Sequence, residues 1–295
     1  MHLSAGDVIA AHRSSGRAFE AAGVDSFALD QGDGPAVVCL HGVPASSFLY
    51  RKVVRGLAGL GLRGVAFDFP GLGLAGRPRD FDYTWSGLAR WTAAAIDALG
   101  IDRCHLVVHD IGGPIGLEWA IGHPDRVLSV TALDTVLDVA GFRRPWMMEP
   151  FAYPGAGEAW LAGLRPPMSR WIFRYVGLAD RSAMSAAEID AYFELLKLGD
   201  GGRAFLRIMR GFELTPAKEA FLFEGLASRS YPAQVIWGSD DPALGAARRR
   251  AVLDALKLDA ATILPARHFL TEDQATPVTA AIAGLAAGWR GAGRG

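Results

Sequence analysis

One stretch constrains this chain more than any other: an apolar run that ends in an acid and is followed at once by small residues. It runs from Cys104 to Gly116 and reads CHLVVHDIGGPIG. The apolar part predicts a buried strand, and the small residues open a predicted helix that reaches Ile121. A strand, a sharp turn and a helix form an elbow, in which the turn residue is strained and points its side chain into a pocket. Asp110 stands at the turn, where the usual elbow has a serine.

Predicted strands and helices alternate on both sides of this elbow. Weak strand signals lie near 18–22 and 26–29, and Ser47 is predicted to cap a helix over 48–60. Buried strands are expected at 36–40, 64–69, 127–133, 234–237 and 262–264, and further helices at 84–99, 245–256 and the end of the chain. This alternation predicts an α/β fold with a mostly parallel central sheet flanked by helices.

The alternation stops between residues 138 and 223. This part has helical patches, scattered tryptophans and prolines, but no strong strand signal. We therefore predict a helical lid (cap) inserted after the sixth strand, over the carboxyl edge of the sheet, where open α/β sheets place their sites. Residues 1–137 and 224–290 then form the core, and 291–295 are predicted to be a disordered tail.

Asp110 needs partners if it attacks a substrate, because attack on carbon leaves an ester that activated water must hydrolyse. His268, in the loop after the last strand, is the candidate base, since imidazole titrates near neutrality. Asp241 is the candidate acid that orients it, with Asp240 as the alternative. All three follow strands of one sheet, in the order nucleophile, acid, histidine, so they can converge. His109 is a rival base, but strand alternation points it away from Asp110.

Composition and charge indicate which kinds of partner and which compartment to expect. A net charge of -1 gives no electrostatic reason to expect nucleic acid or an anionic membrane. Cys39 and Cys104 lie in apolar strand-like runs, which favours buried free thiols and a reducing compartment. The first residues show no secretory signal, and 276–289 is too short to span a bilayer, so we expect a soluble, cytoplasmic protein. We expect no cofactor and no metal, and the sequence carries no signal of oligomeric state.

These motifs together resemble the α/β-hydrolase branch with an aspartate nucleophile, which contains epoxide hydrolases and haloalkane dehalogenases. The resemblance covers 37–289 and rests on HGVP at 41–44, the glycine-rich loop 68–78, HDIGG at 109–113, WGSDDP at 237–242 and the loop around His268. It implies the α/β-hydrolase fold, with Asp110 as nucleophile, His268 as base and Asp241 as acid. It also implies that the backbone N–H groups of Val43 and Ile111 stabilise the oxyanion.

The resemblance allows two chemistries, and the sequence departs from the usual pattern of both. Dehalogenases hold the leaving halide with N–H donors, commonly a tryptophan directly after the nucleophile and in some members an asparagine in the HGxP loop. Here those positions are Ile111 and Val43. Epoxide hydrolases protonate the ring oxygen with lid tyrosines, usually two. Tyr153 fits the first position, and no tyrosine stands near 209–212, where the second is usual.

Because Tyr153 offers an acidic hydroxyl while a halide lacks a partner, the sequence ranks epoxide hydrolysis first and dehalogenation by the same triad second. Hydrolysis of another electrophile comes third, and a catalytically inactive hydrolase-fold scaffold is the non-enzymatic alternative. The apolar lid predicts a small hydrophobic substrate, with water as co-substrate. Lid residues that could contact the substrate or assist its leaving group are Tyr153, Tyr175, Trp146 and Trp171, with Tyr192 and Trp160 also in the lid. Asp134 or Asp138 would be the acid if neither Asp241 nor Asp240 serves, as in some dehalogenases.

Overall fold

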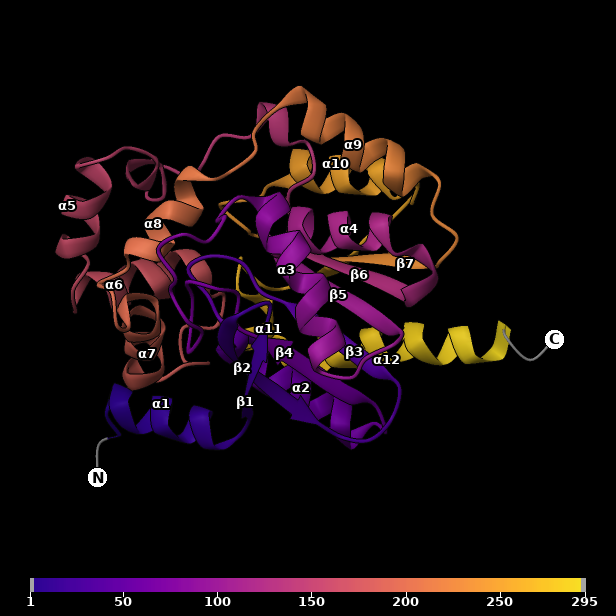
Figure 1. The fold of residues 1–295 in the computed structure, drawn as a ribbon, viewed down its shortest axis with the longest axis horizontal. Helices are drawn as coiled ribbons and strands as arrows, with labels where there is room; N and C mark the ends of the chain where they lie inside the picture. The colour runs from indigo at the N-terminus through magenta and orange to yellow at the C-terminus, as the bar shows by residue number, and fades with distance from the viewer. Residues whose placement is uncertain (1–2, 293–295) are drawn as a thin grey trace.

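The computed structural model describes residues 3–292, and its centre is one eight-stranded sheet (Figure 1). The strands are β1 (Arg17–Ala21), β2 (Val24–Gln31), β3 (Ala36–Leu40), β4 (Arg63–Phe67), β5 (Cys104–Asp110), β6 (Val127–Thr135), β7 (Ala233–Gly238) and β8 (Thr262–Leu264). Their order across the sheet is β1-β2-β4-β3-β5-β6-β7-β8. β2 is antiparallel to both of its neighbours, and all other pairs are parallel. The predicted mostly parallel sheet is confirmed.

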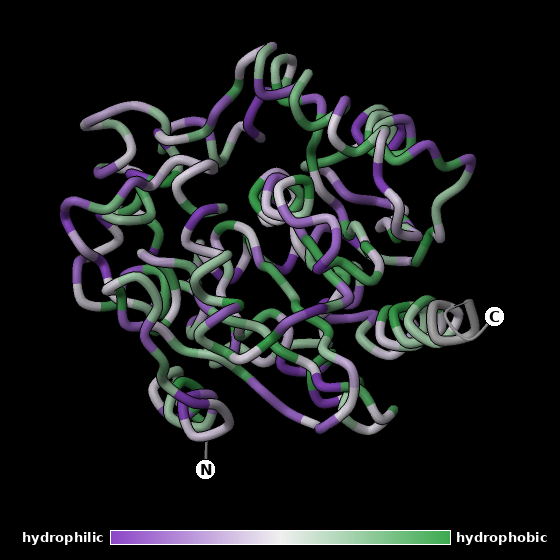
Figure 2. Tube along the Cα trace, turned by 45° about the vertical axis from the view of Figure 1, so that its right-hand side comes forward, coloured by the Kyte–Doolittle hydropathy of each residue, from purple (hydrophilic) through white to green (hydrophobic). Residues whose placement is uncertain are grey.

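Helices cover both faces of the sheet, as predicted. One face carries α3 (Trp85–Ala98), α4 (Gly112–Gly122), α9 (Pro216–Ala227) and α10 (Ala246–Ala255), and the other carries α2 (Arg51–Gly59) and α12 (Ala275–Ala292). Successive residues of a strand point to opposite faces, so Val38 and Leu40 pack in the first layer and Val37 in the second. Hydrophilic residues, purple in Figure 2, gather mainly on the outer loops.

The N-terminal part differs from the prediction in two details. Helix α1 (Ala5–Ser14) precedes the sheet and packs against α7; it starts with a capping box between Ser4 and Asp7. The predicted helix over 48–60 begins as a 3₁₀ turn before α2, and its cap is Ser46, whose Oγ accepts from the N–H of Phe48 at 3.3 Å. The N–H of Ser47 donates instead to Asp68 Oδ1, at 2.6 Å.

Helices occupy the segment between β6 and β7. They are α5 (Ala156–Gly163), α6 (Met168–Ile172), α7 (Ala186–Lys197) and α8 (Arg203–Arg210), and no strand lies among the described residues of this segment. Helix α9 follows but packs against α4 and α10, with Gly225 directly on Ile121. We therefore propose that the lid ends before α9, near residue 215, rather than at 223.

A buried charge cluster fixes α7 to the core. Glu272, on α11 (Leu270–Asp273), is 2% exposed, accepts from the Tyr192 hydroxyl at 2.5 Å and pairs with Arg51 and Lys52. Arg51 also reaches Glu188 of α7, at 2.7 Å. Because a buried charge is tolerated only when paired, this cluster holds α7 beside the loop that carries His268.

The C-terminal end of the chain is helical for longer than predicted. α12 continues through Ala292, so the predicted disordered tail starts too early; residues 293–295 lie outside the described residues. Within residues 3–292, no helix combines the length and the apolar character needed to cross a membrane.

Candidate active site

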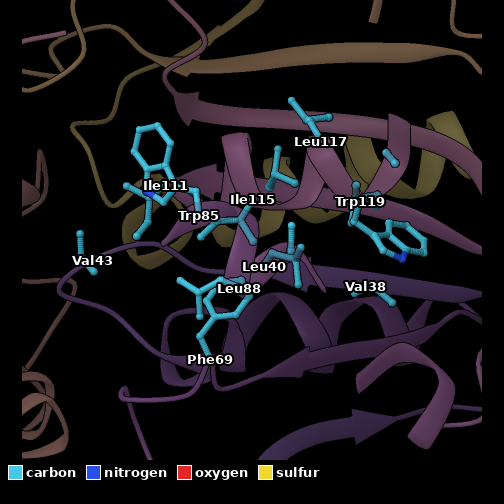
Figure 3. Close-up of a cluster of buried hydrophobic side chains, with 14 of the residues drawn as sticks. Val38, Leu40, Val43, Phe69, Trp85, Leu88, Ile111, Ile115, Leu117 and Trp119 are labelled. Carbon is cyan, nitrogen blue, oxygen red and sulfur yellow. The ribbon is translucent and has the colours of Figure 1, made fainter. Parts of the chain in front are cut away.

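The elbow stands where β5 meets α4. Asp110 has a φ of 53°, a left-handed conformation that residues with a side chain rarely adopt. The Thr135 hydroxyl donates to the carbonyl of Asp110 at 2.6 Å, and a Cβ at Gly42 would collide with the Asp110 carboxylate. Beneath the turn, Ile111 and Ile115 pack among buried apolar side chains of neighbouring elements (Figure 3). The sequence thus holds Asp110 in the strained conformation expected of an elbow.

Two backbone N–H groups meet the Asp110 carboxylate. The N–H of Val43 donates to Oδ1 at 2.8 Å, and the N–H of Ile111 also hydrogen-bonds to this side chain. Burial raises the pKa of Asp110 above its ordinary value, against the opposing effects of His268 and these two donors. The side chain is still 15% exposed, so it can be reached from the adjacent cavity. The two N–H groups predicted for an oxyanion hole therefore lie at the carboxylate itself.

The structure brings His268 and Asp241 to the same place. His268 Nε2 is 3.7 Å from Asp110 Oδ2, and His268 Nδ1 is 2.9 Å from Asp241 Oδ2. The other oxygen of Asp241 accepts from the N–H groups of Ala243 and Leu244, at 2.7 and 3.1 Å. Both His268 and Asp241 are 7% exposed. The structure thus brings together the three residues, far apart in the sequence, that are predicted to be nucleophile, base and acid.

The charges in this chain stabilise a protonated imidazole. Burial alone would lower the pKa of His268, but the facing Asp241 and Asp110 carboxylates outweigh it and raise the pKa to about 9. Burial would raise the pKa of Asp241, yet His268 and the two N–H donors hold it below its usual value. The two facing carboxylates therefore favour the protonated form of His268 in the free protein.

The alternative acids have hydrogen-bond or ion-pair partners other than His268. Asp240 is exposed and accepts from the Ser239 hydroxyl at 3.0 Å, and Asp138 pairs with Arg248. Asp134 is buried, and its Oδ1 accepts from the N–H of Gly238 at 3.0 Å. The rival base His109 bonds through Nε2 to the carbonyl of His268 at 2.8 Å, and burial first of all lowers its pKa to about 3. It therefore supports the loop that carries His268.

Asp241→Asn should reduce turnover by about 10⁴-fold, because the amide favours the wrong imidazole tautomer and no longer stabilises the imidazolium. Asp240→Asn is the matched control and should stay within about twofold of the unmodified protein, since its carboxylate faces solvent. Steady-state kinetics of both variants measures the contrast. If both variants lost equal turnover, or the Asp240 variant lost more, Asp241 would not be the acid that orients His268.

A largely apolar cavity of about 300 Å³ lies over the triad. Its charged lining groups, among the described residues, are Asp110, His268 and Arg144. Trp146 and Trp160 also line it, and the indole N–H of Trp160 donates to the carbonyl of Met147 at 2.9 Å. The remaining lining is mainly apolar, for example Phe142, Phe151, Leu164, Phe173, Phe205, Met209, Phe212 and Leu244. The cavity suits a small hydrophobic molecule with few polar groups.

Three of the lid residues expected at the substrate are not among the described residues that line this cavity: Tyr153, Tyr175 and Trp171. Tyr153 is 56% exposed, and its hydroxyl donates to Glu149 Oε1 at 2.9 Å. Trp171 and Tyr175 stack on each other, with ring centroids 5.2 Å apart, and both are exposed. Each of these side chains has a partner on the lid surface, which explains why it points away from the cavity. Of the four expected contacts, only Trp146 lines the cavity.

A match to the model of the α/β hydrolase fold family covers residues 35–273. The chain belongs to the α/β-hydrolase family. A haloalkane dehalogenase from Mycolicibacterium paratuberculosis is 32% identical to this hydrolase in an alignment of 256 residues, which covers 83% of this chain and 82% of that protein.

Two solved structures show the same fold as this hydrolase. A haloalkane dehalogenase from Bradyrhizobium elkani superposes with a TM-score of 0.78 at 24% identity, over 94% of this chain and 99% of that one. An epoxide hydrolase from Vigna radiata superposes with a TM-score of 0.72 at 23% identity, over 90% and 95% of the two chains.

Arg144 is the charged lining residue of the hydrolase that sequence analysis missed. It stands in the run Arg143-Arg144-Pro145-Trp146, where two charged residues precede two apolar ones without a helical or strand period. Its position in an aromatic-rich part of the lid could have indicated a functional residue, because arginine side chains are rarely buried among apolar residues without a partner. Within the described residues, no cluster of histidine, cysteine or acidic side chains is placed to hold a metal ion.

Proposed function

We propose that this hydrolase releases halide from small halogenated compounds through an ester on Asp110. The observation that carries the proposal is the cavity lining: among the described residues it includes Trp146 and Trp160 but no tyrosine. Tyr153 was the reason to rank epoxide opening first, and its hydroxyl is engaged with Glu149 on an exposed part of the lid. The similarity to haloalkane dehalogenases over most of the chain supports the same order.

In the first step, Asp110 Oδ2 attacks the carbon that carries the halogen. The carbon–halogen bond breaks, the halide leaves with the bonding electron pair, and an ester forms between the substrate carbon and Asp110. Oδ1 stays against the N–H of Val43, 2.8 Å away, which fixes the carboxylate for the attack. The indole N–H of Trp146 is the lid donor that we assign to the departing halide, because that of Trp160 is engaged with Met147.

In the second step, water attacks the carbonyl carbon of the ester while His268 Nε2 accepts a proton from it. Esterification removes the negative charge 3.7 Å from Nε2, so the pKa of His268 falls from its raised value and the imidazole can serve as base. The N–H groups of Val43 and Ile111 stabilise the oxyanion on Oδ1. The intermediate then breaks its bond to the alkoxide oxygen, which takes the proton from His268 and leaves as the alcohol, while the Asp110 carboxyl loses its remaining proton to water and is a carboxylate again.

A parallel assay of haloalkanes and epoxides tests this order. We expect halide from 1-bromohexane and little diol from 1,2-epoxyhexane. Tyr153→Phe should leave halide release within about twofold, because the exposed phenol is no positioned general acid. Diol formation that drops roughly a hundredfold in Tyr153→Phe would restore epoxide hydrolysis to first place. Absence of both products from a folded protein that still binds ligand would favour the inactive scaffold.

A further inference from the structure

We propose that Arg144 forms an anion-binding site in the lid wall of the cavity, and that the substrate carries a carboxylate there. The reacting carbon would lie at the other end of the same molecule. This inference rests on the proposed function for the chemistry at Asp110, but the anion site itself can be tested without turnover.

The Arg144 side chain is held in place while part of it remains free. One terminal nitrogen donates to the carbonyl of Met209 at 2.8 Å, and the guanidinium lies over the Phe212 ring, 4.7 Å from its centroid. Its Nε is buried and has no hydrogen-bond partner. A guanidinium has five N–H donors, so this arrangement leaves donors for a ligand in the cavity.

Arg144 lacks the ion pair that two other lid arginines have. Arg170 pairs with Asp190 and Arg210 with Glu158, whereas no carboxylate among residues 3–288 lies at ion-pair distance from Arg144. The acid whose charge acts on it is Glu149, but that carboxylate already accepts from Tyr153. A partly desolvated cation in apolar surroundings is costly unless an anion joins it, and a bound substrate can supply that anion.

The size of the cavity limits the substrate that can reach both Arg144 and Asp110, which line it together. The cavity of about 300 Å³ holds roughly ten non-hydrogen atoms at the ~30 Å³ that a water molecule occupies in the liquid. A six-carbon chain with a terminal halogen and a terminal carboxylate therefore fits, with the carboxylate at Arg144 and the halogenated carbon at Asp110.

A carboxylate suits this site better than the departing halide does. The planar fork of arginine matches two carboxylate oxygens, which gives both direction and strength to the contact. A spherical halide offers no such pair of oxygens, and a leaving halide must be held next to the carbon that Asp110 attacks.

Binding of hexanoate and hexanamide tests the site in the absence of any reaction. Calorimetry, or the fluorescence of the cavity tryptophans, should show hexanoate binding about 10- to 100-fold more tightly, the usual range for a hydrogen bond to a charged group. Arg144→Gln should abolish this preference and Arg144→Lys should retain part of it. Arg143→Gln is the matched control, because Arg143 is exposed and does not line the cavity. Equal binding of the two ligands by the unmodified protein would overturn the inference.

Turnover of 6-bromohexanoate and 6-bromohexanamide separates the inference from the proposed function. The unmodified protein should prefer the anion in kcat/KM by the same factor, and Arg144→Gln should lose this preference through KM while the amide reacts as before. If Arg144→Gln slows both substrates equally with an unchanged melting temperature, Arg144 serves the leaving group and the inference fails. If neither substrate releases bromide but the hexanoate preference still depends on Arg144, the proposed function fails and the anion site stands.

Discussion

Asp110→Ala is expected to abolish halide release, with a loss of roughly 10⁴- to 10⁶-fold, the scale seen when a nucleophile is removed from a catalytic triad. Without the carboxylate no ester can form, and the N–H groups of Val43 and Ile111 have no reacting carbonyl to act on. Bromide release from 1-bromohexane measures the loss. The cavity lining is otherwise unchanged in this variant, so ligand binding should persist.

Asp240→Ala serves as the control for removal of an acid near the site, because Asp240 is exposed and lies outside the cavity. It should keep near-normal turnover. If Asp110→Ala retained more than about a tenth of the activity, the covalent route would be wrong. Direct attack by water, with His268 as base, would then be the mechanism to consider.

His268→Gln should produce a single burst of halide and then stop, because alkylation of Asp110 comes before the step that needs a base. The ester should accumulate to about one per chain. Mass spectrometry of the peptide that contains Asp110 should show the added alkyl group, and water labelled with ¹⁸O should not enter Asp110 in this variant. In the unmodified protein repeated turnovers should introduce ¹⁸O into this carboxylate, since water attacks the ester carbonyl.

The pH dependence of the two steps provides a second test of the roles of Asp110 and His268. The pKa of Asp110 is raised, so alkylation should weaken as pH falls through that raised value and be independent of pH above it. Ester hydrolysis needs neutral imidazole and should therefore rise with pH until His268 in the ester has lost its proton. His268→Gln should retain only the acidic limb, seen in the rate of the burst. If the rate of ester hydrolysis in that variant still rose with pH in the same way, the base would be another group.

The sequence was most informative where a backbone pattern determines position. Asp110, Asp241 and His268 follow predicted strands, and the carboxyl ends of parallel strands meet at one edge, so their convergence could be predicted before any distance was known. The family resemblance, and not this argument, implied the N–H of Val43, which follows β3 and reaches Asp110. Helix α1 could also have been found, because Ser4 and Asp7 form a recognisable capping box.

Side-chain directions in the lid could not be predicted in this way. Residues 142–153 form turns and short 3₁₀ segments, so no period indicates which side chains face the cavity. Tyr153 turns outward to Glu149, while Arg144 and Trp146 line the cavity. The direction of each side chain depends on its hydrogen-bond partner. For Arg144 that partner is the carbonyl of Met209 on α8, which lies far away in the sequence.

The left-handed conformation of Asp110 has a consequence for anyone who engineers this protein for heat resistance. A side chain at φ 53° costs on the order of 1 kcal/mol, and burial of its carboxylate adds to that cost. Glycine at this position would remove both penalties together with the nucleophile. A screen that rewards melting temperature alone would therefore favour dead variants at this position, and libraries built for robustness need a parallel selection for turnover.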